Sequence, residues 1–226
     1  MTNAIVLLSS GLDSTVNLFL AKKKSHVTLN LTFDYGQRSA KKEIEQSKKI
    51  SNYLGIPHQV IELGWLKKVS TSSLTNQDLD IPTGNQVQID DFKISSATAK
   101  SVWVPNRNGV FLNIAAAIAE AMQIDQIIPG FNLEEAATFP DNTEAFMKSA
   151  TAAFKFSTAN NVEVISHTIN MKKTEIFKQA LIEKIPLNLL WPCYFDFDKW
   201  CGQCESCLRT QRAMLENNIN FQEYFL

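Results

Sequence analysis

The hydrophobic and polar positions of the chain follow two periods, and their alternation predicts the order of the secondary structure. Short apolar or β-rich runs occupy residues 4–8, 27–33, 58–63, 125–129 and 162–165, and each has the length of a strand. Segments with helical spacing lie at residues 12–20, 38–54, 105–122, 143–158, 172–184 and 204–216. Strands that alternate with helices require crossover connections, so the pattern predicts an α/β fold with a doubly wound, parallel, five-stranded sheet.

Residues 66–103 interrupt this regular alternation. The segment is rich in Ser, Thr, Asn and Gln and contains Pro82 and Gly84, so we expect a long excursion from the sheet with one short helix near Ala97. The helix that follows is predicted to begin at Pro105, because proline fits the first helical turn, where no backbone donor is needed.

The composition narrows the class of protein. The chain has 226 residues, of which 45% are hydrophobic and 20% are charged, and its net charge is −1. These values fit a globular protein with its own core. No apolar run approaches the ~20 residues of a membrane span, and the N-terminus lacks a basic leader, so we expect a cytoplasmic protein. The absence of a large positive charge argues against nucleic acid as a partner.

The cysteines all lie near the C-terminal end, at Cys193, Cys201, Cys204 and Cys207. Clustered thiols in a reducing compartment more often hold a metal than form disulfides. The spacing C-x₇-C-x₂-C-x₂-C favours a closed, structural zinc site. An iron–sulfur cluster is the rival interpretation, although the ferredoxin run C-x₂-C-x₂-C-x₃-C-P does not occur. We expect a zinc-binding, helical region at residues 189–226 beside a nucleotide-binding α/β domain at residues 1–188.

The turn after the first predicted strand reads Ser-Ser-Gly-Leu-Asp-Ser-Thr over residues 9–15. Its small residues let backbone N–H groups approach an anion, its serine hydroxyls add donors, and the helix behind it presents its positive end. Asp13 would repel a bare phosphate, so we interpret it as a ligand of bound Mg²⁺. The same residues could instead be plain caps of a strand-to-helix turn. The chain has neither a G-x-x-x-x-G-K-[ST] nor a G-x-G-x-x-G motif, which disfavours a Walker-type kinase and a nicotinamide dehydrogenase.

Two arginines are candidates for binding an anion, and one of them stands at the end of a predicted strand, the edge at which open α/β sheets bind ligands. Arg38 follows the second strand, and Arg107 opens the helix after the excursion. Each offers a forked cation for a phosphate or a carboxylate. Both could equally be solvated surface arginines.

Residues 9–14 resemble the S-G-G-x-D-S loop of the PP-loop ATP pyrophosphatases, with Ser10 at the position of the first glycine. If Ser10 takes a positive φ, serine is strained there. Further segments match the QueC family of this group, in order: FDYGQR at residues 33–38, VPNRN at 104–108, GFN at 130–132, FPD at 139–141 and the cysteine cluster. The resemblance covers nearly the whole chain, and the combination is specific although no single piece is.

The resemblance implies a Rossmann-like fold of the adenine nucleotide alpha hydrolase type and a C–N bond-forming ligase that uses ATP and Mg²⁺. It implies 7-carboxy-7-deazaguanine and ammonia as substrates and 7-cyano-7-deazaguanine (preQ0), a precursor of queuosine, as product. It is compatible with a homodimer. For the nucleotide it implies contacts from Leu8, Ser9, Ser10, Gly11, Leu12, Asp13, Ser14, Thr15, Val16, Asn17, Leu18, Tyr35, Gln37 and Gly130.

The resemblance also assigns residues to the acid and to the reacting groups. The reacting groups are expected to contact Asp13, Ser14, Arg38 and Arg107. The acid is expected to contact Arg107, Asn108, Asn132, Glu135, Phe139 and Asp141. A carboxylate at Glu135 suits the N–H donors of a guanine-type edge, although Glu134 and Glu135 could instead be a solvated pair. Lys172 and Lys173 stand near the position of a family lysine, where one of them would meet a phosphate or simply be solvated.

Residues 139–143 depart from the family pattern Tyr-Pro-Asp-Cys-Arg, and the missing arginine removes a charge partner. Lys148, Arg107 or another cation could replace it. The departure keeps open a relative that stops at the amide or acts on another carboxylate. The turn at residues 9–15, called the phosphate loop below, is also compatible with a PP-loop tRNA-modifying enzyme and with a non-catalytic nucleotide-binding module.

Overall fold

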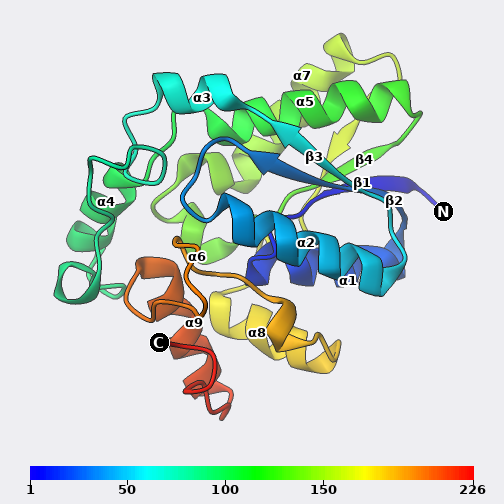
Figure 1. The fold of residues 1–226 in the computed structure, drawn as a ribbon. Helices are drawn as coiled ribbons and strands as arrows, with labels where there is room; N and C mark the ends of the chain where they lie inside the picture. The colour runs from blue at the N-terminus through cyan, green and yellow to red at the C-terminus, as the bar shows by residue number, and fades with distance from the viewer.

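The computed structural model describes residues 1–226, and its central element is a parallel sheet of five strands (Figure 1). The strands are β1 (Asn3–Leu7), β2 (His26–Asp34), β3 (His58–Glu62), β4 (Gln126–Ile128) and β5 (Glu163–Val164). Their order across the sheet is β3-β2-β1-β4-β5, so the chain builds outward from β1 on both sides. Every neighbouring pair is parallel, which confirms the predicted α/β class.

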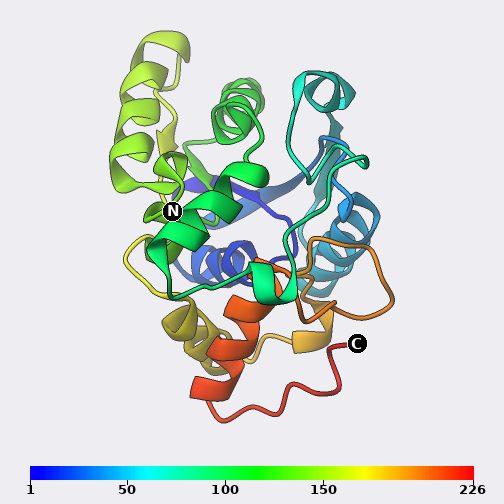
Figure 2. The same cartoon turned by 90° about the vertical axis from the view of Figure 1, so that its left-hand side faces the viewer.

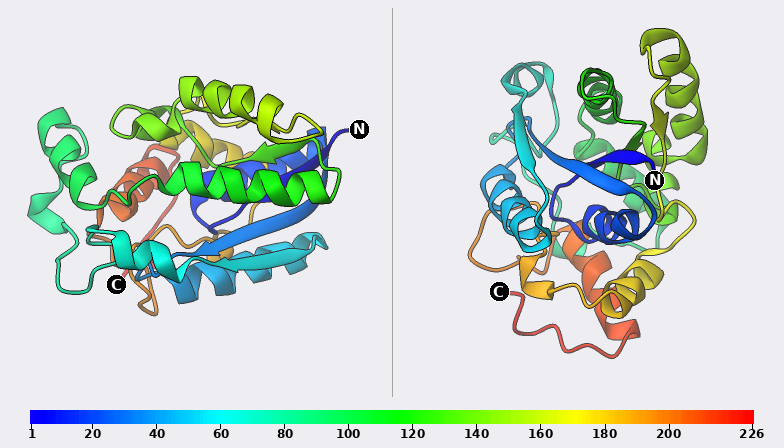
Figure 3. Two further views of the ribbon diagram at one scale, coloured as in Figure 1. Left: turned by 90° about the horizontal axis from the view of Figure 1, so that it is seen from above. Right: turned by 90° about the vertical axis from the view of Figure 1, so that its right-hand side faces the viewer.

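Helices cover both faces of the sheet. The right-hand panel of Figure 3 shows α1 (Leu12–Lys24) and α2 (Ala40–Leu54) on one face and α5 (Arg107–Ala121) and α7 (Glu144–Ser157) on the other. A strand covered on both faces has no solvent side, so its sequence need not alternate. The run Ala4–Ile5–Val6 in β1 is accordingly buried throughout.

Two helices begin later than their sequence patterns predict. α5 begins at Arg107 rather than at Pro105, because Asn106 takes φ +50, a left-handed conformation that ends the extended segment before the helix. α2 begins at Ala40 rather than at residue 38, because the turn that contains Gly36, with φ +83, separates it from β2. Its other end is as predicted, with Gly55 in the left-handed conformation at the C-cap.

The excursion after β3 contains more regular structure than the sequence predicts. The expected short helix is α4 (Phe92–Ser101), whose first N–H groups are capped by the side chain of Asp91. α3 (Gly64–Val69) and a 3₁₀ turn at Gly84–Gln86 were not predicted. Figure 2 shows α4 lying in front of the carboxyl ends of the strands, so the excursion covers that edge of the sheet.

The C-terminal part of the chain packs on the same edge. α8 (Lys173–Ile182) contacts α1, and α9 (Glu205–Glu216) contacts α8. A single cluster of 39 buried residues runs from Ile5 in the sheet to Cys204 and Met214. Residues 189–226 therefore share a core with residues 1–188. None of the helices combines the length and the apolar character that crossing a membrane would need.

Candidate active site

The turn between β1 and α1 is built around a buried serine. Ser10 takes φ +58, a conformation that glycine adopts more readily. Its Oγ donates to the carbonyl of Ser9 at 2.5 Å, and its own carbonyl accepts a hydrogen bond from the backbone N–H of Trp191 at 2.8 Å. These bonds hold the strained conformation, so serine is accommodated in this turn.

The start of α1 offers hydrogen-bond donors to an anion. The first backbone N–H groups of a helix have no carbonyl partner within it, and no side chain caps them here. The hydroxyl groups of Ser9 and Ser14 lie 3.1 Å apart beside them. Uncapped N–H groups, hydroxyl donors and the positive end of the helix together make a site for phosphate.

Gly130 allows β4 to approach this turn closely. A Cβ atom at position 130 would lie 2.7 Å from the backbone nitrogen of Ser14, a distance that real Cβ atoms do not adopt. Gly130 therefore acts through close packing, since any side chain would push the end of β4 away from the phosphate loop.

A cavity of about 240 Å³ lies beside the loop, at the carboxyl edge of the sheet. Its walls come from the loop, from the segment after β2, from the end of the excursion, from residues 129–142 and from the cysteine region. The residues predicted for the site that line it are Leu8, Ser9, Gly11, Leu12, Asp13, Ser14, Tyr35, Gln37, Arg107, Asn108, Gly130, Glu135, Phe139 and Asp141.

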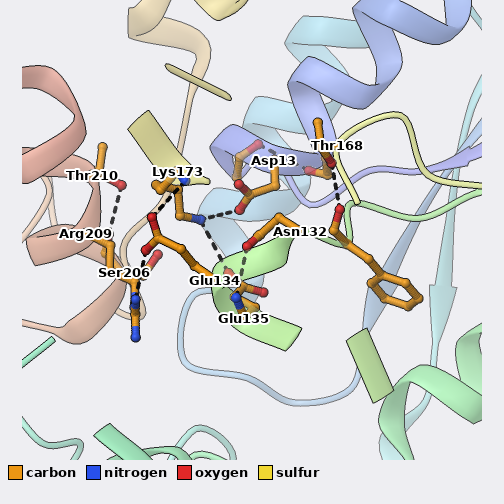
Figure 4. A network of polar contacts seen from close by, with 12 residues as sticks. Asp13, Asn132, Glu134, Glu135, Thr168, Lys173, Ser206, Arg209 and Thr210 are labelled. Carbon is orange, nitrogen blue, oxygen red and sulfur yellow. Dashed lines mark hydrogen bonds and ion pairs between the residues drawn. The ribbon is translucent and has the colours of Figure 1, made fainter. Parts of the chain in front are cut away.

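A buried lysine joins two acidic residues in this cavity (Figure 4). The Lys173 ammonium group contacts the carboxylate of Asp13 and lies 3.3 Å from Glu135 Oε1. The side chain of Lys173 is only 3% exposed, so this contact is largely shielded from water. The sequence left Lys172 and Lys173 as equal candidates, and the structure brings only Lys173 to the cavity.

Burial and charge set the ionisation of this group. Burial raises the pKa of Asp13 to about 6, Lys173 opposes the rise and Glu135 adds to it. Burial alone would lower the pKa of Lys173, but the two carboxylates raise it, so the ammonium stays charged. Asp13 Oδ1 is buried and has no hydrogen-bond partner. An unsatisfied carboxylate oxygen facing a cavity is a candidate metal or hydrogen-bond acceptor site.

Arg107 also lines the cavity, in the first turn of α5. Its guanidinium lies over the ring of Tyr35, 5.7 Å from the centroid, and donates to the Tyr35 hydroxyl at 3.4 Å. Asn108 donates to the carbonyl of Asp141 at 3.3 Å, which ties α5 to the loop that contains the altered family motif. Arg107 is therefore a cation at the cavity wall that its contact with Tyr35 holds in place.

Other predicted residues lie outside the cavity. The Arg38 guanidinium donates to the backbone carbonyls of Ser73, Asn76 and Leu79, so the structure uses Arg38 to hold the excursion and not to face the cavity. Asn132 is buried and caps the short helix α6 (Leu133–Ala136) by accepting from the Glu135 N–H at 3.0 Å. Ser10, Thr15, Val16, Asn17 and Leu18 support the loop from within the core.

The cations considered as replacements for the missing arginine of residues 139–143 also differ in where they lie. Lys148 pairs with Glu144 on the exposed side of α7 and does not line the cavity. Thr143 caps α7 through a bond from the Phe146 N–H, and Asn142 donates to Asp141 Oδ1 at 3.2 Å. The residues that replace the family's Cys-Arg thus serve local structure.

The structure adds residues that sequence reasoning missed. Glu43 lines the cavity and accepts hydrogen bonds from Ser39 and Gln37, and burial raises its pKa. Trp103 lies nearly parallel to Phe139, at a tilt of 8° and a centroid distance of 6.2 Å. Neither belongs to a recognisable motif. Only the position of Trp103 directly before the Val-Pro-Asn-Arg-Asn segment could have drawn attention to it.

The cysteines form a compact group. The four sulfur atoms lie within 4.8 Å of one another, and the structure contains no disulfide. Backbone N–H groups of Phe195 and Cys201 point at Cys193 Sγ at 3.4 and 3.3 Å. Such donors stabilise thiolates, which are the form that binds metal.

Comparison with known proteins identifies the family. The family model for the queuosine biosynthesis protein QueC matches residues 3–218. A 7-cyano-7-deazaguanine synthase from Bdellovibrio bacteriovorus is 56% identical over 222 residues, covering 98% of this chain and 96% of that protein. One from Carboxydothermus hydrogenoformans is 50% identical over 213 residues, covering 94% of this chain and 98% of that protein.

A solved structure shares the fold at low identity. The U34-tRNA thiolase NcsA from Methanococcus maripaludis, solved with its [4Fe-4S] cluster, matches with a TM-score of 0.51 and 16% identity, over 96% of this chain and 66% of that chain. With the family match extending over the sheet, the phosphate loop and the cysteine cluster, this chain belongs to the QueC family.

Proposed function

We propose that this chain is an ATP-dependent 7-cyano-7-deazaguanine synthase, which converts 7-carboxy-7-deazaguanine and ammonia to the nitrile. One observation supports the proposal for this member of the QueC family. A single cavity joins an uncapped, serine-lined helix start, the Asp13–Lys173 pair and Arg107. Such a cavity brings a helix start that can bind phosphate and a cation that can bind a carboxylate to the same place.

The phosphate loop would bind the nucleotide. Ser9, Ser14 and the N–H groups at the start of α1 would donate to its phosphates. Asp13 fits a Mg²⁺ ion, since its Oδ1 is buried and lacks a partner, and Glu135 lies close by on the far side of Lys173. Mg²⁺ there would neutralise phosphate charge. Lys173, which contacts Asp13, would contribute a second positive charge as pyrophosphate leaves.

The planar acid would lie near the aromatic pair. Trp103 and Phe139 both line the cavity, and an aromatic ring offers a stacking face to any flat heterocycle. Glu135 and Asp141 are acceptors for the N–H groups of a guanine-type edge. Arg107 has the charge and the fork geometry to bind the carboxylate.

The chemistry requires activation twice. A carboxylate oxygen attacks the α-phosphate of ATP and pyrophosphate leaves; ammonia then adds to the acyl carbon and AMP departs with that oxygen, leaving an amide. The amide oxygen attacks a second ATP in the same way, and loss of AMP and protons gives the nitrile. The chain's residues orient the reactants and stabilise charge, and no covalent nucleophile is needed.

The cysteine cluster would hold structural zinc. Two sulfurs bound to one zinc at ~2.3 Å in a tetrahedron lie ~3.8 Å apart, and Cys201 Sγ lies 3.8 Å from Cys207 Sγ. With four thiolates, zinc would have no open position, so it would stabilise the C-terminal region and take no part in the reaction. The need for reduced thiols agrees with a cytoplasmic location, and the net charge of −1 gives no reason to add a nucleic-acid partner.

Incubation with ATP, Mg²⁺, ammonium and 7-carboxy-7-deazaguanine, followed by mass spectrometry, tests the proposal. We expect the nitrile, with AMP and pyrophosphate as co-products. Accumulation of the amide alone would instead identify a relative that stops halfway. Absence of both products and of AMP would refute the proposed function. Size-exclusion chromatography with light scattering tests the expected homodimer separately.

A further inference from the structure

A chain of ion pairs and hydrogen bonds connects the cysteine cluster to the phosphate loop. It begins at the start of α9, where Glu205 follows Cys204 directly. Glu205 is 5% exposed, and its Oε1 accepts from Arg209 Nη2 at 2.8 Å and from Arg209 Nε at 3.1 Å. Its Oε2 accepts from the Thr98 hydroxyl in α4 at 3.1 Å. Glu205 therefore fixes Arg209 and the excursion to the cysteine region.

Arg209, which itself lines the cavity, extends this connection to the residues beside the phosphate loop. Its Nη1 donates to Glu134 Oε2 at 2.9 Å, as Figure 4 shows. Glu134 Oε1 accepts from the backbone N–H of Lys173 at 2.9 Å. Lys173 in turn contacts Asp13 in the phosphate loop. One arginine thus lies between a metal-binding region and the residues expected to meet ATP.

The geometry of the network points to positioning and not only to packing. Glu134 and Glu135 are neighbours in α6, a helix of four residues that cannot hold its place by its own hydrogen bonds. Glu134 binds the start of α8, and Glu135 contacts the lysine at that start. A shift of Glu134 would therefore move Glu135 and Lys173 together.

We propose that Arg209 is a positioning residue that holds Lys173 and α6 against the phosphate loop, and that the cysteine centre anchors Arg209 through Glu205. The metal site then supports nucleotide activation through a defined path of ion pairs and hydrogen bonds, in addition to stabilising the C-terminal region. The proposal rests on the proposed function only in that ATP use is its readout.

Arg212 provides a matched control. It also pairs with Glu134, at 2.6 Å, but its side chain is 26% exposed and its other partner, Asp90, is 81% exposed. Arg212 makes no contact with Glu205. Arg212→Met therefore removes one cation from Glu134 and leaves the path from the cysteine cluster intact.

The test compares Arg209→Met, Arg209→Lys and Arg212→Met in the metal-loaded protein. Metal content, circular dichroism and Tm establish folding, and kcat and KM are measured for ATP and for the acid. Since small displacements of positioning groups cost up to ~100-fold in rate, we expect Arg209→Met to lower kcat/KM for ATP by about 10-fold or more at unchanged metal content. Arg209→Lys should recover part of the loss, and Arg212→Met should stay within about twofold of the wild type.

A second variant covers the case in which Arg209→Met does not fold. Arg209→Met/Glu205→Gln also removes the buried carboxylate that would be left without a cation, while a side-chain oxygen at position 205 can still accept from the Thr98 hydroxyl. If a folded, metal-loaded Arg209 variant keeps wild-type kcat/KM for ATP, or if Arg209→Met and Arg212→Met lose it equally, the proposal is overturned. Failure of the proposed function looks different, because the wild type would then make neither amide nor nitrile.

Discussion

Ionisation of Asp13 should control the binding of Mg²⁺ and ATP. Burial raises the pKa of Asp13 to about 6, although Lys173 is in contact with it. A protonated carboxyl group is a poor ligand for a hard cation, so Mg²⁺-dependent nucleotide binding must first remove the proton. The affinity for Mg²⁺ and ATP should therefore be level above about pH 7 and fall about tenfold for each pH unit below about pH 6.

Calorimetric titration with a non-cleavable ATP analogue and Mg²⁺, from about pH 5 to pH 8, measures this dependence. Asp13→Asn is the control, because it keeps the shape of the side chain and cannot titrate. Phosphate itself titrates near ~6, but this contribution is common to both proteins, so the ratio of their Kd values isolates Asp13. If the two profiles run parallel, Asp13 does not take part in nucleotide binding and the reasoning is wrong.

The same carboxyl group makes a second, independent contribution, to stability. The folded protein binds this proton more tightly than the unfolded chain, so the contribution is present at low pH and is lost as the pH rises through the folded-state pKa. A rise in pKa from 3.8 to about 6 corresponds to ~3 kcal/mol. Without ligands, Asp13 should thus contribute a fall of up to ~3 kcal/mol in the free energy of unfolding between about pH 4 and pH 7, measured as the difference between the pH profiles of the wild type and Asp13→Asn.

Three further changes should have distinct effects. Trp103→Ala should raise KM for the acid by about tenfold, since stacking of a base on an aromatic ring contributes ~1–3 kcal/mol, while KM for ATP stays constant and Trp103→Phe is mild. Gly130→Ala places a methyl group 2.7 Å from the Ser14 nitrogen and should cost ~1–3 kcal/mol, seen as a lower Tm. Cys201→Ser should lose the bound metal and with it a contribution on the order of 10 kcal/mol to folding of the C-terminal region, measured by elemental analysis and thermal unfolding.

The changes at Trp103 and Gly130 each have a matched control elsewhere in the chain. Trp65 is 51% exposed and does not line the cavity, so Trp65→Ala should leave the KM for the acid unchanged. A Cβ at Gly64 would meet nothing within 4 Å, so Gly64→Ala should not lower Tm as Gly130→Ala does. Equal effects within either pair would contradict the packing arguments. A Cys201→Ser protein that retains stoichiometric metal would contradict the four-sulfur site.

The periodic parts of the sequence predict the fold well, and the reason is physical. A strand buried on both faces, such as β1, is apolar throughout, and a helix on a sheet repeats its apolar positions. The succession of strands and helices along the chain is therefore visible in the pattern. The start of α5 is not visible in this way. Pro105 and Asn106 are both compatible with a helix start, and only the packed structure selects the left-handed conformation of Asn106.

The candidate site, like the fold, is only partly predictable from the sequence. The phosphate loop and the cysteines are local motifs, and the cavity is lined by residues of both. Arg38 contacts Ser73, which lies 35 positions away in the chain, and Arg209 contacts Glu134, which lies 75 positions away. No local pattern encodes such a contact. The sequence around an arginine is the same whether its side chain contacts a ligand or a group of backbone carbonyls.

The position of the cysteine region explains why it is more than a terminal appendage. Trp191, Cys193 and Tyr194 line the cavity, and the Trp191 N–H holds the carbonyl of the strained Ser10. Gln203 binds the excursion through its carbonyl, which accepts from the Gly84 N–H at 3.0 Å. The same segment therefore closes the cavity, supports the phosphate loop and holds the excursion over the sheet edge. Because the sheet alone leaves that edge open, a metal that orders this segment would complete the cavity from outside the sheet.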